Sequence, residues 1–212
     1  SGAAGVVKKG NGIQVIYGPR VTVIKSNLVD FMSTAASDDI DGILGGAEDA
    51  PVEEKDEANK KKSIDAKIYA PIKGEVVALS EVEDGVFSEG MMGEGIAIKP
   101  EEGKVYAPFD GECTMVFDTK HALGLISENG VELLIHIGID TVKLNGECFD
   151  IKVNSGDKIK KGDLLAEVDL EEIKAKGYKI ITPVIVTNTD DYSKITGDSK
   201  SVNVGDEILT IR

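Results

Sequence analysis

The 212-residue sequence lacks several features that mark common protein classes. It has no run of about 18 apolar residues, so we expect no membrane-spanning helix. Its start, S-G-A-A-G-V-V-K-K-G, lacks a charged segment followed by a long apolar one, so we do not expect it to be a signal peptide. No Met begins it, which suggests a fragment or a processed chain. Cysteine is scarce: Cys113 and Cys148 lie 35 residues apart, outside any C-x-x-C pattern, which favours a reducing cytoplasm.

Basic residues are also in deficit, with 24 Lys and Arg against 38 Asp and Glu, for a net charge of −14. This balance argues against a nucleic-acid partner, because phosphate backbones bind clustered Lys and Arg. A basic protein partner would be attracted instead. Apolar residues still make up 41% of the chain, with long Val, Ile and Leu runs, so at least part of it should fold into one or two globular domains.

Much of the negative charge lies in one segment. Residues 38–57 hold nine acids and one Lys, interrupted by Gly and Pro. Such a composition buries too little apolar surface to offset the entropy of ordering, so we predict a flexible acidic linker over 33–63, with an interaction tail as the alternative. Before it, 12–16 predicts a strand and 19–32 a helix. These pieces are too small for an independent core and suggest the end of a domain.

Beyond the linker, apolar runs alternate with Gly, Asp, Asn and Pro, as in a β protein. The predicted strands are 66–69, 74–79, 95–99, 104–106, 111–117, 123–127, 131–137, 163–168 and 207–211. One helix is predicted at 169–177, with Asp169 as its cap and Gly177 as its stop. Residues 64–212 are therefore expected to be mainly β, an antiparallel sandwich or barrel with one short helix.

Two pairs of similar sequence motifs support one compact β domain. A-P-I-K-G (70–74) resembles A-P-F-D-G (107–111), and V-N-S-G-D-K-I (153–159) resembles V-N-V-G-D-E-I (202–208). Each is typical of a turn that leads into a strand, because Pro sets φ and Gly permits positive φ.

The chain has two histidines, and both belong to predicted strands or their ends. In V-E-L-L-I-H-I-G (131–138), alternation places Val131, Leu133, Ile135 and Ile137 on one face, which should form the core. His136 shares the other face with Leu134 and Gly138. A satisfied core histidine is the alternative interpretation.

His121, in T-K-H-A-L-G-L (119–125), could converge with His136 if the two strands pair. Two adjacent imidazoles suggest a metal site, a catalytic pair or phosphohistidine chemistry. A structural zinc site needs four ligands and a catalytic one usually three; Asp140 could supply a third, but the spacing matches no strong zinc signature. A nucleophilic imidazole needs one unprotonated nitrogen and a fixed tautomer, and the small Gly138 would admit a partner or a phosphoryl group.

Several long motifs carry a clear family resemblance, in order along 64–212. G-E-G-I-A-I-K-P (93–100), A-P-F-D-G, T-K-H-A (119–122), G-V-E-L-L-I-H-I-G-I-D-T-V (130–142) and T-P-V-I-V-T-N (182–188) resemble enzyme IIA of the glucose family. That family belongs to the bacterial phosphoenolpyruvate-dependent sugar phosphotransferase system. G-A-A-G-V-V and G-I-Q-V-I-Y-G-P resemble the end of an enzyme IIB domain. The implied division is 1–32 as a small α+β IIB fragment, 33–63 as linker and 64–212 as IIA.

The resemblance implies a role for each matched residue. His136 would accept a phosphoryl group on Nε2, and His121 would stabilise the phosphoryl oxygens. Thr119 would help to position the pair, Gly138 would offer its carbonyl to Nδ1 of His136, and Asp140 would lie at the rim. No cofactor is then required; zinc could bind at His121 and His136 but should not be essential.

The resemblance also implies partners: phospho-HPr as donor, the cysteine of an enzyme IIB as acceptor, and membrane enzyme IIC in a full-length permease. An apolar docking surface would be formed by Val86, Phe87, Met91, Met92, Phe117, Leu134 and Val142. Core packing is the alternative for the loop G-V-F-S-E-G-M-M-G (85–93), because Met often fills gaps. The acids Glu89, Glu94 and Asp140 would suit a basic HPr.

One departure limits these expectations. The family's IIB cysteine lies in a loop near the start of that domain, and no such loop occurs here; Cys113 and Cys148 match no functional position. The chain should therefore accept a phosphoryl group but not carry it onward through its own cysteine. We expect a cytoplasmic phosphocarrier, at the membrane's cytoplasmic face if part of a permease, with glucose or N-acetylglucosamine as candidate sugars. Alternatives are a regulatory binding protein and a zinc metallopeptidase, although the latter needs a third ligand and an H-x-H pair. A biotinyl or lipoyl carrier would need a Lys within a recognisable hairpin motif, which is absent.

Overall fold

The computed structural model describes residues 3–9, 12–17 and 64–212. The chain divides into two compact units, Ser1–Asn59 and Lys60–Arg212. In the described parts of the chain, no helix combines the length and the apolar character needed to cross a membrane.

In the first unit, β1 (Ala3–Lys9) pairs antiparallel with β2 (Gly12–Tyr17), which confirms the strand predicted at 12–16. The helix predicted at 19–32 and the linker predicted at 33–63 lie outside the described residues. The division into IIB fragment, linker and IIA domain therefore stays a prediction.

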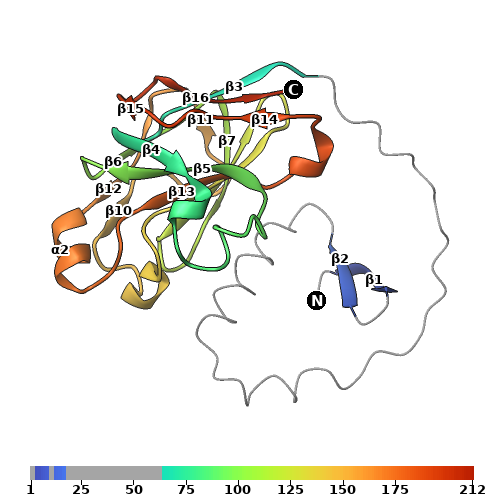
Figure 1. The fold of residues 1–212 in the computed structure, drawn as a ribbon. Coiled ribbons are helices and arrows are strands. Elements are labelled where there is room, and N and C mark those ends of the chain that lie inside the picture. The colour runs from blue at the N-terminus through green and yellow to red at the C-terminus, as the bar shows by residue number, and fades with distance from the viewer. Residues whose placement is uncertain (1–2, 10–11, 18–63) are drawn as a thin grey trace, which may run out of the picture. The chain divides into compact units, whose positions relative to one another are not determined.

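Most of the regular secondary-structure elements of the second unit are strands (Figure 1). They are β3 (Ala66–Tyr69), β4 (Gly74–Ala78), β5 (Glu94–Pro100), β6 (Lys104–Tyr106), β7 (Gly111–Val116), β8 (Ala122–Ser127), β9 (Glu132–His136), β10 (Phe149–Ile151), β11 (Lys158–Ile159), β12 (Leu164–Val168), β13 (Thr182–Val186), β14 (Ile195–Thr196), β15 (Ser201–Val202) and β16 (Glu207–Ile211). Between them lie 3-10 helices η2 (Leu79–Glu81), η3 (Thr141–Leu144) and η4 (Thr189–Asp191), and the α-helix α2 (Leu170–Ala175).

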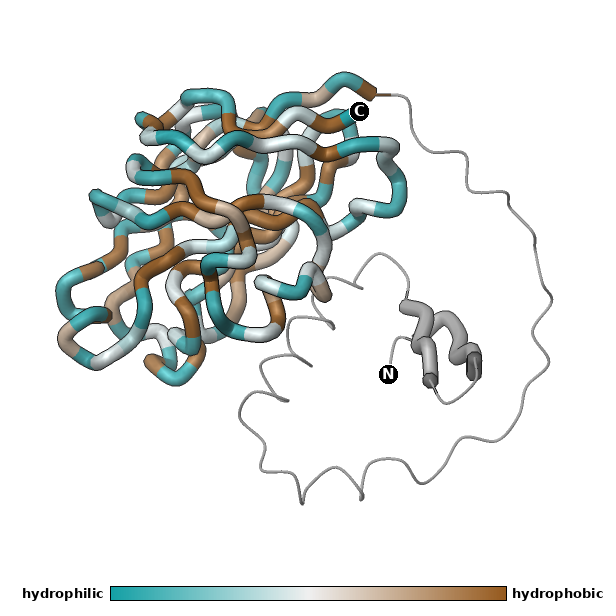
Figure 2. The backbone as a smooth tube through the Cα atoms, viewed as in Figure 1, coloured by the Kyte–Doolittle hydropathy of each residue, from teal (hydrophilic) through white to brown (hydrophobic). Residues whose placement is uncertain are grey.

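These strands form three antiparallel sheets. The largest has the order β11-β7-β8-β9-β13-β5-β4-β15, and the others are β10-β12-β6 and β14-β16-β3. Ile68, Ile135 and Leu165, one from each sheet, belong to a single hydrophobic core, so the sheets pack on one another. Hydropathy follows this arrangement, with apolar stretches along the inner strands and polar ones on the connections (Figure 2). The mainly β, sandwich-like prediction is confirmed, and none of the sheets in the described part closes into a barrel.

All nine strands predicted for this second unit are present to within one residue at each end. The helix is confirmed as well: Asp169 caps α2 by accepting a hydrogen bond from the backbone N–H of Glu172 at 2.9 Å, and Gly177 follows the helix with φ +87°.

The most important strand without a sequence prediction is β13, at the centre of the large sheet between β9 and β5. Its five residues are all buried, so it lacks the alternation that marks a half-exposed strand. It also contains Pro183, which argues against a central strand because proline has no N–H. The pairing with β9 covers Val184, Ile185 and Val186, all of which follow Pro183 in the chain, so the missing donor breaks no bond of that ladder.

The two pairs of similar sequence motifs form similar turns in the structure. The carbonyl oxygen of Pro71 accepts from Tyr106 N at 2.8 Å, and that of Pro108 accepts from Tyr69 N at 3.2 Å, so the A-P motifs are bonded reciprocally to each other's flanks. In the other pair, Asp157 accepts from Asn154 N at 2.7 Å and Asp206 from Asn203 N at 2.8 Å. The expected strand–turn repetition is confirmed.

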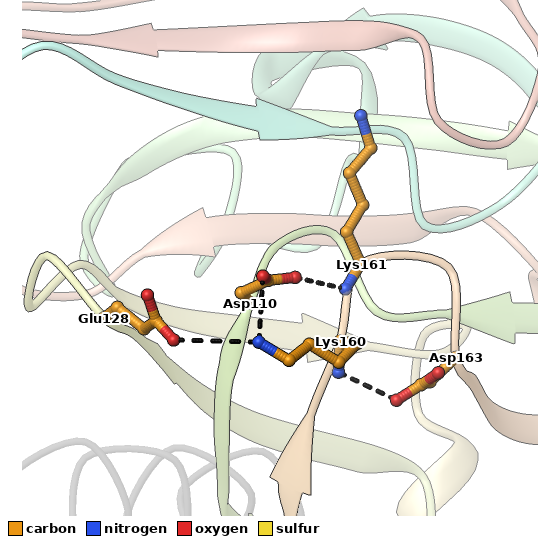
Figure 3. A network of polar contacts seen from close by, with 5 residues as sticks. All are labelled: Asp110, Glu128, Lys160, Lys161 and Asp163. Atoms are coloured by element: carbon orange, nitrogen blue, oxygen red, sulfur yellow. Dashed lines mark hydrogen bonds and ion pairs between the residues drawn. The ribbon is translucent and has the colours of Figure 1, made fainter.

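A third turn of this kind, at 160–163, is anchored by Asp110 (Figure 3). Asp163 accepts from the N–H of Lys160 at 2.8 Å, as in the two related turns. Asp110 accepts from the N–H of Lys161 at 2.8 Å and from Lys160 Nζ at 3.2 Å, while Glu128 lies 3.9 Å from the same ammonium. The backbone bond of Lys161, followed by the ammonium of Lys160, holds the pKa of Asp110 below its ordinary value.

Candidate functional site

The pairing of β8 with β9 brings the two histidines together. Ala122 lies opposite His136, and the N–H of Ile137 donates to the carbonyl of His121 at 2.7 Å. The imidazole centroids of His121 and His136 are 4.8 Å apart, with ring planes at 77°. The predicted convergence of the two histidines is therefore confirmed.

The prediction of which residues share each face of β9 is confirmed. Leu133, Ile135 and Ile137 belong to the main core, whereas Leu134 and His136 lie on the opposite face. That face is covered too: His136 is only 4% exposed and Leu134 is completely buried. The two imidazoles therefore occupy an enclosed site, in which hydrogen bonds are stronger than in water.

The ring of His136 is oriented by the backbone that follows it. Its Nδ1 lies 2.7 Å from the carbonyl oxygen of Gly138. A carbonyl can only accept, so Nδ1 carries the proton, and in the neutral ring the lone pair is on Nε2. Gly138 has φ +75°, and a Cβ there would lie 2.6 Å from Thr141 Cγ2 and 2.7 Å from the carbonyl oxygen of Lys179. The position thus requires glycine both for its backbone conformation and for space.

His121 has a different partner. Its Nδ1 lies 2.6 Å from the hydroxyl oxygen of Thr119, in the turn that precedes β8. A hydroxyl can donate or accept, so this contact permits either tautomer of the neutral ring. His121 is 1% exposed, so its tautomer is set by neighbours within the site rather than by bulk water.

Two phenylalanines line the site. Phe87 packs against His136 with ring centroids 4.9 Å apart, and Phe117 packs against His121 at 5.4 Å in an edge-on arrangement.

The loop that carries Phe87 is ordered by Asp84, whose carboxylate accepts from the N–H groups of Val86, Phe87 and Ser88 at 3.0–3.2 Å. Asp84 had no predicted role, although Asp followed by Gly is a known signal for such a side-chain-capped turn.

The predicted docking surface divides into two groups. Phe87, Met92, Phe117 and Leu134 are buried, so they form walls of the site or pack beneath it. Met91 is 53% exposed, and Val86 and Val142 are half-buried. The exposed and half-buried residues are the ones that a partner could contact, and their role in docking stays a prediction.

Acidic residues lie at the edge of the loops around the site. Asp140, two residues beyond Gly138, is exposed, has φ +62° and forms an ion pair of 3.2 Å with Lys143. Glu89 and Glu94 are exposed, and the backbone N–H of Glu94 donates to Thr189 Oγ1 at 2.9 Å.

Thr141 is a second residue that the sequence analysis did not identify. It is completely buried, and its hydroxyl donates to the carbonyl of Ile137 at 2.6 Å. It therefore closes the turn that holds Gly138. A threonine just after the end of a strand is the signal that could have pointed to it, because Ser and Thr often bond to the backbone of their own turn.

The two cysteines are free thiols in the positions predicted for ordinary structural residues. Cys113 is buried in β7, and burial raises its thiol pKa to about 11. Cys148 is half-buried just before β10. Within the described residues, no group of three or more His, Cys, Asp or Glu side chains could hold a metal ion. A zinc peptidase site would need such a group.

Comparisons with known proteins identify the family and the fold. Residues 66–192 match the family model of the phosphoenolpyruvate-dependent sugar phosphotransferase system, EIIA 1. The whole chain is 46% identical to the PTS system glucose-specific EIICBA component of Staphylococcus carnosus, of which it spans 30%. The fold resembles the structure of glucose permease IIA from Mycoplasma capricolum, with 38% identity, a TM-score of 0.66, and coverage of 70% of this chain and 96% of that one. The chain belongs to the EIIA 1 family of the phosphoenolpyruvate-dependent sugar phosphotransferase system.

Proposed function

We propose that this chain is a phosphocarrier that accepts a phosphoryl group from phospho-HPr on Nε2 of His136 and passes it to the cysteine of an enzyme IIB domain. The observation that carries the proposal is the 2.7 Å contact between Nδ1 of His136 and the carbonyl of Gly138. It keeps the proton on Nδ1 and leaves the nucleophilic lone pair on Nε2.

In the forward step, the lone pair on Nε2 of His136 attacks the phosphorus of the donor's phosphohistidine. The new Nε2–P bond forms as the donor's N–P bond breaks, and the electron pair of that bond returns to the donor's ring. Nδ1 keeps its proton throughout, and its hydrogen bond to Gly138 stabilises the positive charge that the ring gains. Catalysis of such a transfer consists mainly of positioning and electrostatic stabilisation.

His121 would stabilise the charge on the transferred group. Its ring lies 4.8 Å from that of His136, centroid to centroid. For Nε2 of His121 to donate to a phosphoryl oxygen, its Nδ1 must accept, and the hydroxyl of Thr119 at 2.6 Å can supply that proton. The second transfer, to the thiolate of enzyme IIB, reverses the roles: the Nε2–P bond breaks and an S–P bond forms.

The wider role in sugar uptake rests on the relatives. The curated relative combines several components in one glucose-specific protein, and this chain spans 30% of it. We propose that the chain works with enzymes IIB and IIC on the cytoplasmic side of the membrane, and that glucose is a better candidate than N-acetylglucosamine. Comparing phosphoryl transfer to isolated glucose-type and N-acetylglucosamine-type IIB domains would test that preference.

The decisive experiment is phosphorylation of the purified chain with phosphoenolpyruvate, enzyme I and HPr. One phosphoryl group per chain is expected, labile in acid and stable in alkali. Because the chain has two histidines, two variants assign the site. His136→Ala should abolish labelling, whereas His121→Ala should still be labelled but pass the group to enzyme IIB on the order of 100-fold more slowly. Equal labelling of the His136 variant would refute the assignment.

A metal arm can be added to the same experiment. We propose that no metal ion takes part in this chain's transfers, because the step described uses only imidazole nitrogens and the phosphoryl group. A chain stripped of metal by a chelator and then dialysed should be labelled at the rate of the untreated chain. A requirement for added zinc would contradict this.

A further inference from the structure

We propose that Thr141 is a positioning residue that fixes the reactive tautomer of His136 by holding the turn at Gly138. Thr141 is completely buried, and its hydroxyl donates to the carbonyl of Ile137 at 2.6 Å. Its importance for phosphoryl transfer rests on the function proposed above, but its effect on the imidazole does not.

The hydroxyl of Thr141 satisfies a buried backbone group at the end of β9. Ile137 is 1% exposed, so water has little access to its carbonyl, and a buried carbonyl without a partner is costly. The bond spans residues 137 to 141, which are the residues that reverse the chain after His136. Two of them, Gly138 and Asp140, have left-handed backbone conformations, with φ of +75° and +62°. A turn of this kind persists only where its surroundings hold it.

The methyl group of Thr141 confines Gly138 from one side. A Cβ built on Gly138 would lie 2.6 Å from Thr141 Cγ2 and 2.7 Å from the carbonyl oxygen of Lys179. That carbonyl accepts a hydrogen bond from the N–H of Ile139 at 2.9 Å, which fixes the other side of the turn. Gly138 is therefore packed between a side chain and a neighbouring backbone, which leaves no room for a Cβ, while the hydroxyl bond of Thr141 to Ile137 holds the turn itself.

The direction of the Gly138 carbonyl decides which ring nitrogen of His136 is protonated. With Gly138 O at 2.7 Å, Nδ1 must donate and Nε2 keeps its lone pair. If the turn relaxes, the neutral ring can move its proton to Nε2, which then cannot attack phosphorus. Such a change lowers the fraction of reactive molecules, so kcat falls while binding of the donor protein, measured by KM, changes little.

Two substitutions separate the hydroxyl from the methyl. Thr141→Val keeps the shape but removes the donor, and Thr141→Ser keeps the donor but removes the methyl. The ¹⁵N NMR shifts of His136 in the full chain distinguish a protonated from an unprotonated Nδ1. We expect the proton to stay on Nδ1 in the parent and in Thr141→Ser, and to be shared with Nε2 in Thr141→Val. The matched control is Thr196→Val, at an exposed threonine in β14.

Kinetics provide the second readout. For transfer from phospho-HPr, Thr141→Val should lower kcat on the order of tenfold and change KM by less than about twofold, because a misplaced reacting group affects the chemical step. Thr141→Ser should recover most of the parent's kcat. A purely structural role would lower the stability of Thr141→Val without moving the proton.

Each outcome decides the matter. A folded Thr141→Val chain that keeps Nδ1 protonated and transfers at the parent's rate would overturn the proposal. If Thr141→Val does not fold, Thr141→Ala is the second variant that lacks the hydroxyl: the proposal requires the proton to be shared with Nε2 in it, and a proton that stays on Nδ1 would overturn the proposal. If the parent chain itself is not labelled on His136, the proposed function fails, while the NMR comparison still tests the effect of Thr141 on the ring.

Discussion

Replacing Gly138 with alanine should destabilise the fold in two separable ways. Its φ of +75° lies in the left-handed region, which costs a residue with a Cβ about 1–2 kcal/mol. The new Cβ would also lie 2.6 Å from Thr141 Cγ2 and 2.7 Å from the backbone oxygen of Lys179. Overpacking of this kind costs about 1–3 kcal/mol, because a backbone atom cannot simply rotate away. Together these terms amount to about 2–5 kcal/mol.

Urea unfolding followed by circular dichroism measures the effect. With a slope of about 2 kcal/mol per molar urea, the midpoint should fall by roughly 1–2.5 M at an unchanged slope. A domain of ordinary stability, about 5–15 kcal/mol, would remain folded in buffer in most of this range. Movement of the Gly138 carbonyl away from Nδ1 of His136 should also slow labelling in the folded variant.

Gly177→Ala is the matched control. Gly177 has φ +87°, but a Cβ there would meet nothing within 4 Å, so its substitution should cost only the backbone term of about 1–2 kcal/mol. The difference between the two variants then reports the steric clash alone. If Gly138→Ala costs no more than Gly177→Ala, the reasoning about close contact at Gly138 is wrong. Adding Thr141→Ser to Gly138→Ala should recover part of the loss, because it removes the methyl but leaves the Lys179 carbonyl.

Two further predictions concern titratable groups outside the histidine pair. Asp110 has a pKa below its ordinary value of 3.8, so its charge stabilises the fold above that pH, and the contribution is lost as the pH falls through the lowered pKa. Asp110→Asn should therefore be less stable than the parent at pH 7, with the gap closing in acid; a gap independent of pH in urea titrations would contradict this. Cys113, with a thiol pKa of about 11, should react with Ellman's reagent only after unfolding, whereas half-buried Cys148 reacts in the native chain. Two equally fast thiols would refute the burial argument.

Each strand that the sequence predicted has one of two properties: its two faces differ in polarity, or turn residues bound it at both ends. β9 is the clearest case, because its alternation placed Leu133 and Ile135 in the core and His136 opposite them, as the structure has it. β13 could not be found this way. Its residues are all buried, and Pro183 argues against a strand unless the partner strand is known to end beside it.

The site was only partly predictable for a related reason. Alternation along a strand says which face a histidine occupies but not what covers that face. The covering here comes from Phe87, which is distant in sequence from β9 and is placed by the bonds of Asp84 to its own loop. Likewise, the role of Thr141 depends on its distance to Ile137 and Gly138 across a turn. No sequence pattern predicted the left-handed residues of that turn. Contacts of this kind follow from the tertiary structure and not from local periodicity.

Enclosure and tautomer control in this site depend on each other. A histidine in open water exchanges its proton between the two ring nitrogens, and water would also attack a phosphohistidine. Packing His136 at 4% exposure, with Phe87 against its ring, limits both processes, but it also removes the water that would otherwise hydrogen-bond Nδ1. A fixed acceptor then becomes necessary, and Gly138 supplies it because the absence of a side chain lets the backbone turn tightly beside Thr141. On the function proposed here, the burial of His136 and the glycine at position 138 therefore meet a single requirement. Substituting Phe87, which covers His136, or Gly138 should impair transfer even though the imidazole itself is retained.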